Sequence, residues 1–225
     1  MKISIIIPVL NEVEHIKSTI TTTKTGQNIE VIVVDGGSND GTVEIVRTLK
    51  VSLIKSAPGR ALQMNTGALT ATGDILLFLH ADTQLPPDFD AMIRQALPIP
   101  GIIAGAFSLK IDAEFTSLRL VEKGVSWRSQ FWQMPYGDQA IFLKQEIFQA
   151  VGGFPELPIM EDFELIRKLK RLGKIITLRT PVVTSARRWL KKGIWQTTLI
   201  NQVVIIAYFL NISPITIRNW YRRGK

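Results

Sequence analysis

Short apolar segments alternate with amphipathic segments along the first half of the chain. The apolar segments lie at 2–9, 30–34, 51–55 and 74–79. Between them, apolar residues recur about every three or four positions, in the segments 12–23, 42–49 and 59–70. Apolar strands that alternate with helices are typical of a parallel sheet covered on both faces. The pattern therefore predicts an α/β fold with a mostly parallel central sheet.

The pattern is less regular after residue 80. We expect helices at 86–97 and 161–172 and strands at 104–111 and 139–144. The segment 112–137 contains large side chains without clean periodicity, namely Trp127, Phe131, Trp132, Met134 and Tyr136. We expect this segment to be irregular cover over a site, or a loop that becomes ordered when a ligand binds.

The segment 193–217 contains no charged residue and is long enough to cross a bilayer. As a helix, it would carry Trp195, Leu199, Val203, Ile206 and Leu210 on one side, and Thr197, Asn201 and Tyr208 opposite. Three arrangements stay open: a helix packed on the domain or on a second subunit, an interfacial helix on anionic lipid, or a span. The span is the least favoured, because polar residues interrupt the segment and both flanks are basic.

The composition excludes several classes of protein. The chain has 225 residues, of which 46% are hydrophobic and 20% charged, as in a globular domain and unlike a disordered chain or a bundle of membrane spans. It has no cysteine, which excludes thiol catalysis, disulfides and thiolate metal sites. The apolar run after Met1 stops at Pro8 and is too short for a secretory signal, so we expect a cytoplasmic protein.

The charge is divided unevenly along the chain. The net charge of +8 combines 13 Lys/Arg and 19 Asp/Glu in residues 1–164, a sum of −6, with 14 Lys/Arg and no acid in residues 165–225, a sum of +14. The basic part lacks the interleaved aromatic residues of a nucleic-acid platform, and the rest is acidic. We therefore expect no nucleic-acid partner, and favour an anionic membrane surface, a diphosphate ligand or an acidic protein face.

Two acidic residues follow predicted strands, where ligands bind in open α/β sheets. Asp35 opens the segment DGGSNDGT, and Asp82 lies in HADT two residues after His80, which an extended chain would place on the same side. An aspartate at such a strand end can hold a divalent cation, which would neutralise a diphosphate leaving group. The alternative is that both are ordinary turn residues, with Ser38 or Asp40 as a helix cap.

A third acidic feature is the pair Glu161–Asp162 at the start of a predicted helix. The helix N-terminus favours the ionised carboxylate, which suits a general base for a hydroxyl proton. Acidic residues are also common there for electrostatic reasons alone. Arg60 begins another helix, near Gln63 and Asn65, where it can bind phosphate or simply face solvent. The sequence has no P-loop, no dinucleotide fingerprint and no nucleophile elbow.

Four segments in order resemble the family 2 glycosyltransferases, which have the GT-A fold. They are SIIIPVLNE, VIVVDGGSNDGT, GRALQMNTG with TGDILLFLHADT, and GGFPELPIMEDFEL, over about residues 1–175. The resemblance implies an inverting transfer of a sugar from a nucleotide-diphosphate sugar, most often a UDP sugar, to an acceptor hydroxyl. It also implies a GT-A catalytic domain at 1–185, followed by a basic, apolar helical extension at 186–225.

The resemblance assigns roles by position. Asp162, with Glu161 in the same acidic pair, matches the catalytic base, and Asp82 the last acid of the D-x-D motif, which meets metal and diphosphate. The matching nucleotide-binding positions are Pro8, Asn11, Glu12, Asp35, Gly36, Arg60, Asn65 and Ala81. The acceptor side would include Gly105, Asp138 and the Arg188–Trp189 pair.

One position departs from the family pattern. His80 replaces the first aspartate of D-x-D. Imidazole ligates transition metals, so it would favour Mn²⁺ over Mg²⁺ as the divalent cofactor. Alternatively, His80 only bonds the ribose.

Two alternative functions fit the sequence less well. A sugar nucleotidyltransferase would need a basic, glycine-rich loop after the first strand, where this chain has PVLNE. A non-catalytic nucleotide-sugar or membrane-surface binding module would not need Asp35, Asp82 and Asp162 together. The sequence does not identify the acceptor, although a lipid or isoprenoid would fit contact with the inner face of the membrane. It also leaves open whether the protein forms a homodimer.

Overall fold

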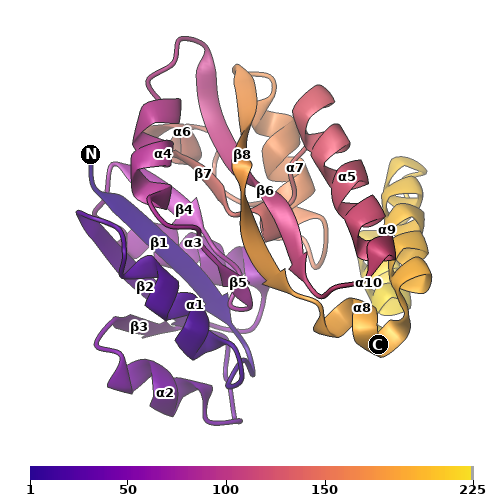
Figure 1. Ribbon diagram of the computed structural model, residues 1–225, viewed down its shortest axis with the longest axis horizontal. Coiled ribbons are helices and arrows are strands. Elements are labelled where there is room, and N and C mark those ends of the chain that lie inside the picture. The colour runs from indigo at the N-terminus through magenta and orange to yellow at the C-terminus, as the bar shows by residue number, and fades with distance from the viewer. Residues whose placement is uncertain (224–225) are drawn as a thin grey trace.

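The computed structural model describes residues 1–223 and has one eight-stranded sheet at its centre (Figure 1). The strand order is β3-β2-β1-β4-β7-β6-β8-β5. Four of the seven pairings are parallel, and the antiparallel ones join β7 to β4 and β6, and β5 to β8. The predicted α/β fold is confirmed. The strands are β1 (Ile3–Val9), β2 (Ile29–Asp35), β3 (Ser52–Lys55), β4 (Ile75–Phe78), β5 (Thr83–Gln84), β6 (Ile102–Asp112), β7 (Ile141–Lys144) and β8 (Lys174–Ser185).

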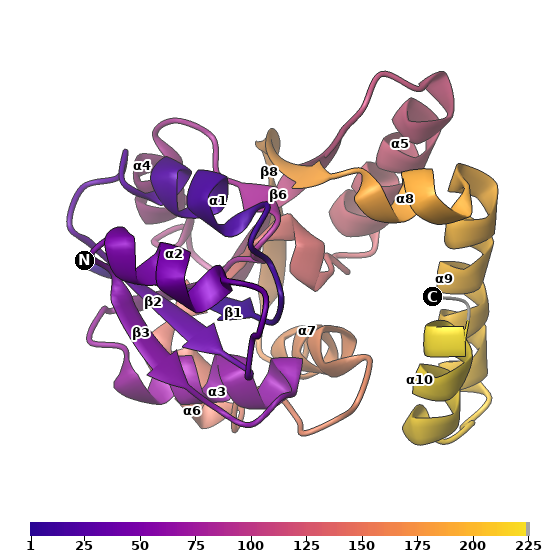
Figure 2. The same cartoon turned by 90° about the horizontal axis from the view of Figure 1, so that it is seen from below.

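Helices cover both faces of the sheet (Figure 2). Along β1, Ile5 and Ile7 belong to the core under one layer, and Ile6 to the core under the other. The first layer is α1 (Ile16–Thr23), α2 (Thr42–Thr48), α4 (Phe89–Ala96) and α5 (Thr116–Phe131), and the second is α3 (Arg60–Thr70), α6 (Gln145–Ala150) and α7 (Glu161–Leu169). Alternation along a strand thus divides the core into two layers.

The segment 112–137 is not irregular, as the sequence suggested, because most of it forms the 16-residue helix α5. Leu118 is buried, and Val121 and Val125 pack beside it on the core. This inward spacing is helical. Exposed aromatic residues on the outer side, including Trp127 and Phe131, hid the period.

Strand β8 was not predicted, because Arg179 and Pro181 interrupt its apolar pattern. The structure accommodates them with a register shift against β6: Phe107 pairs with Leu178, but the next residue, Ser108, pairs with Pro181. A bulge of this kind lets a strand carry a proline without breaking the ladder on both sides.

The segment 193–217 is not one helix. The chain continues from α8 (Arg187–Lys192) into α9 (Ile194–Phe209), turns through Asn211 at φ 59°, and returns as α10 (Pro214–Arg223). Val204 and Ala207 of α9 and Ile217 of α10 pack on Met160 and Phe163. Figure 2 shows α9 at the outer edge of the molecule, with α10 between it and α7. No helix among residues 1–223 is long and apolar enough to cross a membrane.

A carboxylate ties the first strands of the sheet together. Glu30 accepts hydrogen bonds from Ser4 Oγ, Lys2 Nζ and the backbone N–H of Thr72. Burial opposes its ionisation, but these bonds outweigh burial and lower the pKa of Glu30 to about 2, from an ordinary 4.5. The ionised carboxylate therefore stabilises the fold above pH 4.5, and this contribution is lost as the pH falls toward 2.

We expect Glu30→Gln to lower the free energy of unfolding at pH 7 by about 1–3 kcal/mol, because the buried Ser4 hydroxyl and two more exposed donors lose a charged acceptor. Urea unfolding from pH 7 to pH 2 measures the difference from the wild type. The difference should shrink below pH 4.5. A difference that is constant across this range would contradict the assigned role of Glu30.

Candidate active site

The loops after β1 and β2 form the predicted nucleotide side. Asp35 ends β2, is buried, and accepts hydrogen bonds from the N–H groups of Gly37 and Ser38 at 3.1 and 3.0 Å. It lies at a pocket of about 300 Å³, lined by Asp35, Gly37, Ser38, Val43, Glu44, Arg47, Lys55 and Ser56. The pocket is polar, lies at the carboxyl edge of the sheet and is large enough for a nucleotide base.

Hydrogen bonds join the two loops. Asn11, at φ 56°, donates its N–H to Ser38 Oγ and accepts from the N–H of Asn39, both at 2.9 Å. The N–H of Glu12 donates to Thr42 Oγ1 at 2.8 Å. Asn11 and Glu12 thus lie next to the pocket of Asp35, as the resemblance implied.

Gly36 is needed for close packing under these loops. A Cβ there would meet the Gln63 amide at 3.0 Å. That amide donates to the carbonyls of Val9 and Val34, at 2.8 Å each. Pro8, which lies within β1 opposite Val34, precedes this junction.

An arginine side chain lies between two carboxylates at the end of the same sheet. Arg187, the first residue of α8, places Nη2 2.6 Å from Glu12 Oε1 and 3.2 Å from Asp82 Oδ2. Burial opposes its charge, but the two carboxylates raise the pKa of Arg187 above its ordinary value. Glu12 Oε2 is buried without a hydrogen-bond partner. Arg187 was not predicted as a site residue, although it adjoins the Arg188–Trp189 pair.

These groups fit a divalent cation only in part. Asp82 and Glu12 offer hard carboxylate oxygens, one of them unpartnered, at a position that already holds positive charge. No cluster of three or more His, Asp or Glu suited to a metal exists among residues 1–223. Mg²⁺-type ions are held by one or two carboxylates together with substrate phosphates. The site fits a cation that arrives with a diphosphate.

His80 lies on the catalytic side of the site. The chain turns after it, because the N–H of Thr83 bonds to the carbonyl of His80 at 3.1 Å, so the strand alternation that would align His80 with Asp82 does not hold. Its Nε2 is 2.9 Å from the position that a Cβ on Gly137 would occupy. Burial, and then the charge of Arg60, lower the pKa of His80 well below 6.5, so the imidazole is neutral.

Asp162 is held rigidly at the start of α7. Its Oδ2 accepts the N–H of Gly137 at 2.7 Å, and its Oδ1 accepts the N–H of Phe163 at 2.7 Å. Met160 precedes the helix with φ 71°, a left-handed conformation that turns the chain into α7. The same Gly137 position lies 3.2 Å from Asp162 Oδ2. His80 and Asp162 therefore meet at one glycine, and no sequence motif marks this position.

Glu161 faces a different partner. It is buried, and its Oε1 lies 3.8 Å from Nη1 of Arg60, whose side chain is half exposed. Burial raises the pKa of Glu161, Arg60 lowers it, and Asp162 raises it further, with a net upward shift. This contact joins Arg60, at the start of α3, to the start of α7.

Two buried polar atoms of the predicted acceptor side, Asp138 Oδ1 and Arg188 Nε, have no hydrogen-bond partner. Asp138 has a buried Oδ1 with no hydrogen bond, and burial raises its pKa, with Asp162 adding to the effect. Arg188 stacks 4.3 Å above the ring of Tyr221 and donates to Asn201 Oδ1 at 2.9 Å. Burial raises the pKa of Tyr221, the charges of Arg188 and Arg60 lower it, and those of Asp138 and Asp162 raise it further, with a net upward shift. Through Arg188, Tyr221 of α10 contacts the predicted acceptor side, which no sequence motif indicated.

Four predicted site residues have structural contacts instead. A Cβ on Gly105 would collide with the ring of Phe142, inside the sheet. Trp189 is buried in the core. Asn65 bonds both backbone groups of Phe154, at 2.8 and 3.0 Å, and the carbonyl of Ala81 accepts the Thr19 hydroxyl at 2.7 Å. The structure thus shows packing or backbone contacts at these four positions, and their roles at the site stay predictions.

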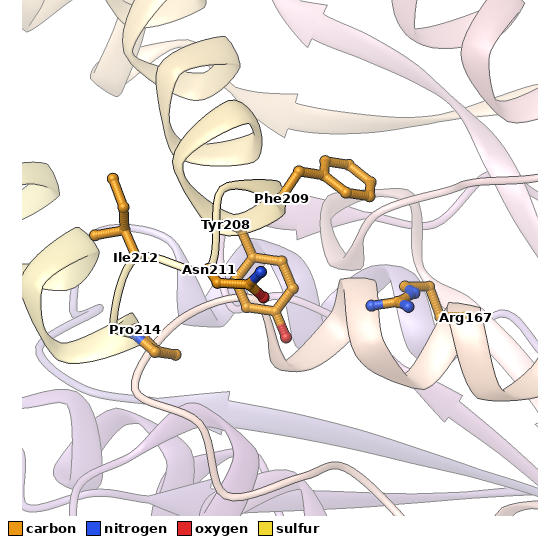
Figure 3. A pocket seen from close by; sticks show the side chains of 6 residues that line it. All are labelled: Arg167, Tyr208, Phe209, Asn211, Ile212 and Pro214. Atoms are coloured by element: carbon orange, nitrogen blue, oxygen red, sulfur yellow. The ribbon is translucent and has the colours of Figure 1, made fainter.

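A second surface pocket lies away from these groups. It is at the turn between α9 and α10, opposite α7, and is lined by Arg167, Tyr208, Phe209, Asn211, Ile212 and Pro214 (Figure 3). Glu164 engages both Arg167 Nη1, at 2.7 Å, and the Tyr208 hydroxyl, at 2.8 Å. Because none of the predicted site residues lines this pocket, it is not the candidate active site.

We expect Gly137→Ala to lower kcat by about tenfold or more, because the added methyl would displace His80 and Asp162, and a small misplacement of reacting groups is costly. Gly124→Ala, on the open outer side of α5, is the matched control and should leave kcat unchanged. Steady-state kinetics of both variants measures the effect. Equal kcat values for the two would contradict the geometry described for Gly137.

Solved structures with a similar fold support this reading of the architecture. S. aureus TarS 1–349 in complex with UDP-GlcNAc matches with a TM-score of 0.64 at 18% identity, over 82% of this chain and 58% of that one. The mannosyltransferase PcManGT from Pyrobaculum calidifontis, in complex with GDP-Man and Mn²⁺, matches with a TM-score of 0.63 at 24% identity, over 82% and 56%. The fold is that of the GT-A nucleotide-sugar transferases.

The chain belongs to glycosyl transferase family 2, whose model matches residues 4–154. The succinoglycan biosynthesis protein ExoA of Rhizobium meliloti is 29% identical over 85% of this chain and 66% of its own length. An undecaprenyl-phosphate 4-deoxy-4-formamido-L-arabinose transferase of Aeromonas hydrophila is 27% identical over 66% of this chain and 51% of its own. The chain spans between about half and two thirds of the length of these curated relatives. The resemblance found in the sequence is confirmed.

Proposed function

We propose that the protein is an inverting glycosyltransferase that moves a sugar from a nucleotide-diphosphate sugar to an acceptor hydroxyl. The observation that carries the proposal is the alignment of three groups at one edge of the sheet: the pocket of Asp35, the charged cluster at Asp82, and the fixed carboxylate of Asp162. The pocket of Asp35 would bind the nucleobase, the cluster at Asp82 would bind the diphosphate, and Asp162 would accept the proton of the acceptor hydroxyl. Residues 1–185 would form the catalytic domain, and 186–225 the extension.

Asp162 acts as the general base. An in-line displacement at the anomeric carbon needs the acceptor hydroxyl to lose its proton on the face opposite the leaving group. The hydrogen bonds from Gly137 and Phe163 fix both oxygens of Asp162, so the carboxylate is oriented before the acceptor arrives. The transfer forms the bond between the acceptor oxygen and the anomeric carbon and breaks the bond to the diphosphate.

The leaving diphosphate needs positive charge. A divalent cation, Mn²⁺ or Mg²⁺, held by Asp82 and Glu12 would neutralise it when bound. Arg187, which now occupies the space between these carboxylates, would turn to the phosphates, and Arg60 lies on the other side. The Mn²⁺ in the similar PcManGT structure supports a metal. His80 would donate or accept a hydrogen bond with the donor sugar nucleotide, or it would hold the backbone at Gly137 in place.

The donor is proposed to be a UDP sugar. The complex of TarS with UDP-GlcNAc supports this choice, and the GDP-Man complex of PcManGT makes a GDP sugar the first alternative. The acid Glu12, directly after β1, disfavours a nucleotidyltransferase, which would need a basic loop there. A non-catalytic binding module remains as an outcome of the test below.

The acceptor is proposed to be a lipid-linked or isoprenoid compound. The relative named as an undecaprenyl-phosphate arabinose transferase supports this class. Met160 and Phe163, on the two sides of the Glu161–Asp162 pair, are buried against α9 and α10. The protein would then act at the cytoplasmic face of a membrane, as a monomer or a homodimer.

A donor panel tests the proposal. The melting temperature is measured with UDP, GDP, CDP and dTDP sugars, with and without Mn²⁺. We expect one nucleotide to stabilise the protein and Mn²⁺ to increase the shift, because a ligand stabilises only the state that binds it. Asp35→Ala should abolish the shift. No stabilisation by any donor would contradict the proposed function.

A further inference from the structure

Helix α9 carries its apolar side chains outward. Trp195, Leu199, Ile206 and Leu210 are between 57% and 69% exposed, and Val203, on the same stripe, is 46% exposed. These positions follow each other at intervals of three or four residues, so they form one face along the helix. The inner side carries buried Thr197, Val204 and Ala207 instead. The helix is therefore apolar on its outer side as well as on its inner side, and an exposed apolar patch of this kind marks an interaction surface.

The helix lies on the body and does not leave it. Val204 and Ala207 pack on Met160 and Phe163, and Asn201 bonds Arg188 on the inner side. Helix α9 has 16 residues, and no helix within 1–223 is suited to span a membrane. Only the outer face is therefore free to meet a partner, and it can do so while α9 stays packed.

Positive charge lies at the N-terminal end of this face. Residues 165–225 contain 14 Lys/Arg and no Asp or Glu. Lys191 and Lys192 lie directly before α9, and neither forms an ion pair within the described residues. Burial, and then the charges of Arg188 and Lys191, lower the pKa of Lys192. An anionic surface would neutralise Lys191 and Lys192.

We propose that the outward face of α9 docks on a bilayer that contains anionic lipids, with the helix lying in the plane of the interface. Apolar residues on one side, bordered by lysines, are the chemistry of an interfacial helix. A second copy fits less well. A two-fold interface would present the same patch twice, and residues 165–225 contain no carboxylate that could neutralise Lys191 and Lys192.

Docking would bring the candidate site close to the lipid. Helix α8 has six residues and connects Arg187, between Glu12 and Asp82, to Lys192, at the start of the docking face. A lipid-borne acceptor would thus reach the site from the surface on which α9 lies. The docking itself does not depend on the proposed transfer reaction, and its test uses no donor.

Vesicle flotation with the full chain tests the proposal. The vesicles contain phosphatidylcholine alone, or phosphatidylcholine with an equal part of phosphatidylglycerol. We expect the protein to bind the anionic vesicles about tenfold or more tightly, and less so at high salt. Replacing Lys191 and Lys192 with glutamine should remove most of this preference.

A matched pair of triple variants tests the apolar face. Trp195→Gln, Leu199→Gln and Ile206→Gln together should reduce binding by about tenfold or more. Leu69→Gln, Ile99→Gln and Leu172→Gln together replace exposed apolar residues on other elements and should bind as the wild type does. Circular dichroism checks that both variants fold. Equal vesicle binding by the two triple variants would overturn the proposal. So would a wild-type dimer, seen by light scattering, that ignores vesicles and dissociates in the α9 variant.

Discussion

Replacing Asp162 with asparagine is expected to reduce kcat by about 10²–10⁴-fold, the usual contribution of a general base. The amide cannot take the acceptor proton. It can still accept the N–H of Gly137 through its one oxygen, but the N–H of Phe163 then loses its partner. We expect a loss of about 1 kcal/mol in stability and no change in donor affinity. Turnover kinetics and calorimetric titration with the donor separate these effects.

Glu164→Gln is the matched control for this variant. Glu164 lies on the same helix, but it bonds Arg167 and Tyr208 on the side away from the site. We expect its kcat to equal that of the wild type. If Asp162→Asn turned over as fast as this control, the base would have to be another group. The nearest candidate would be Asp138, whose Oδ1 is buried without a partner.

The second large effect is expected at Asp82. Asp82→Asn removes a carboxylate that now neutralises Arg187 and would hold the cation at the diphosphate. We expect kcat to fall by about 10²–10³-fold, as for loss of a group that stabilises developing charge. Stimulation by Mn²⁺ should be lost as well. A metal titration of activity measures both.

Asp112→Asn is the control for charge, because Asp112 is an exposed carboxylate at the end of β6. It should keep the metal response of the wild type. A strong Mn²⁺ response in Asp82→Asn would show that the cation is held elsewhere. If activity is unchanged without any metal, Arg187 and Arg60 alone stabilise the negative charge of the leaving diphosphate.

The sequence predicted every strand of the sheet except β5 and β8, because most strands are marked by local signals. Strands β1, β2 and β4 are continuous apolar runs between helices, so their period and punctuation suffice. Asp35 and Asp82 were found for the same reason, since each directly follows such a strand. Strand β8 and helix α5 were missed because their inward residues are diluted by a proline, by charges or by exposed aromatic residues.

The contacts that complete the site could not be predicted, because they join residues far apart in sequence. Arg187 meets Glu12 across 175 positions, and Gly137 meets Asp162 across 25. His80 was expected beside Asp82 because an extended chain was assumed, but a turn separates the two. Gly105 was placed on the acceptor side by motif alone, whereas its neighbour Phe142 fills that space. A single sequence shows residue types, but not which partners they find.

The most direct test of the central proposal is release of the nucleoside diphosphate from the donor that the panel identifies. The protein is incubated with that donor, Mn²⁺, and either the lipid or the water-soluble fraction of a cell extract as the source of acceptor. The proposal predicts release that requires one fraction and is lost in Asp162→Asn. If the donor binds, but the wild type and Asp162→Asn release the diphosphate equally slowly with both fractions, the protein is a binding module and not a glycosyltransferase.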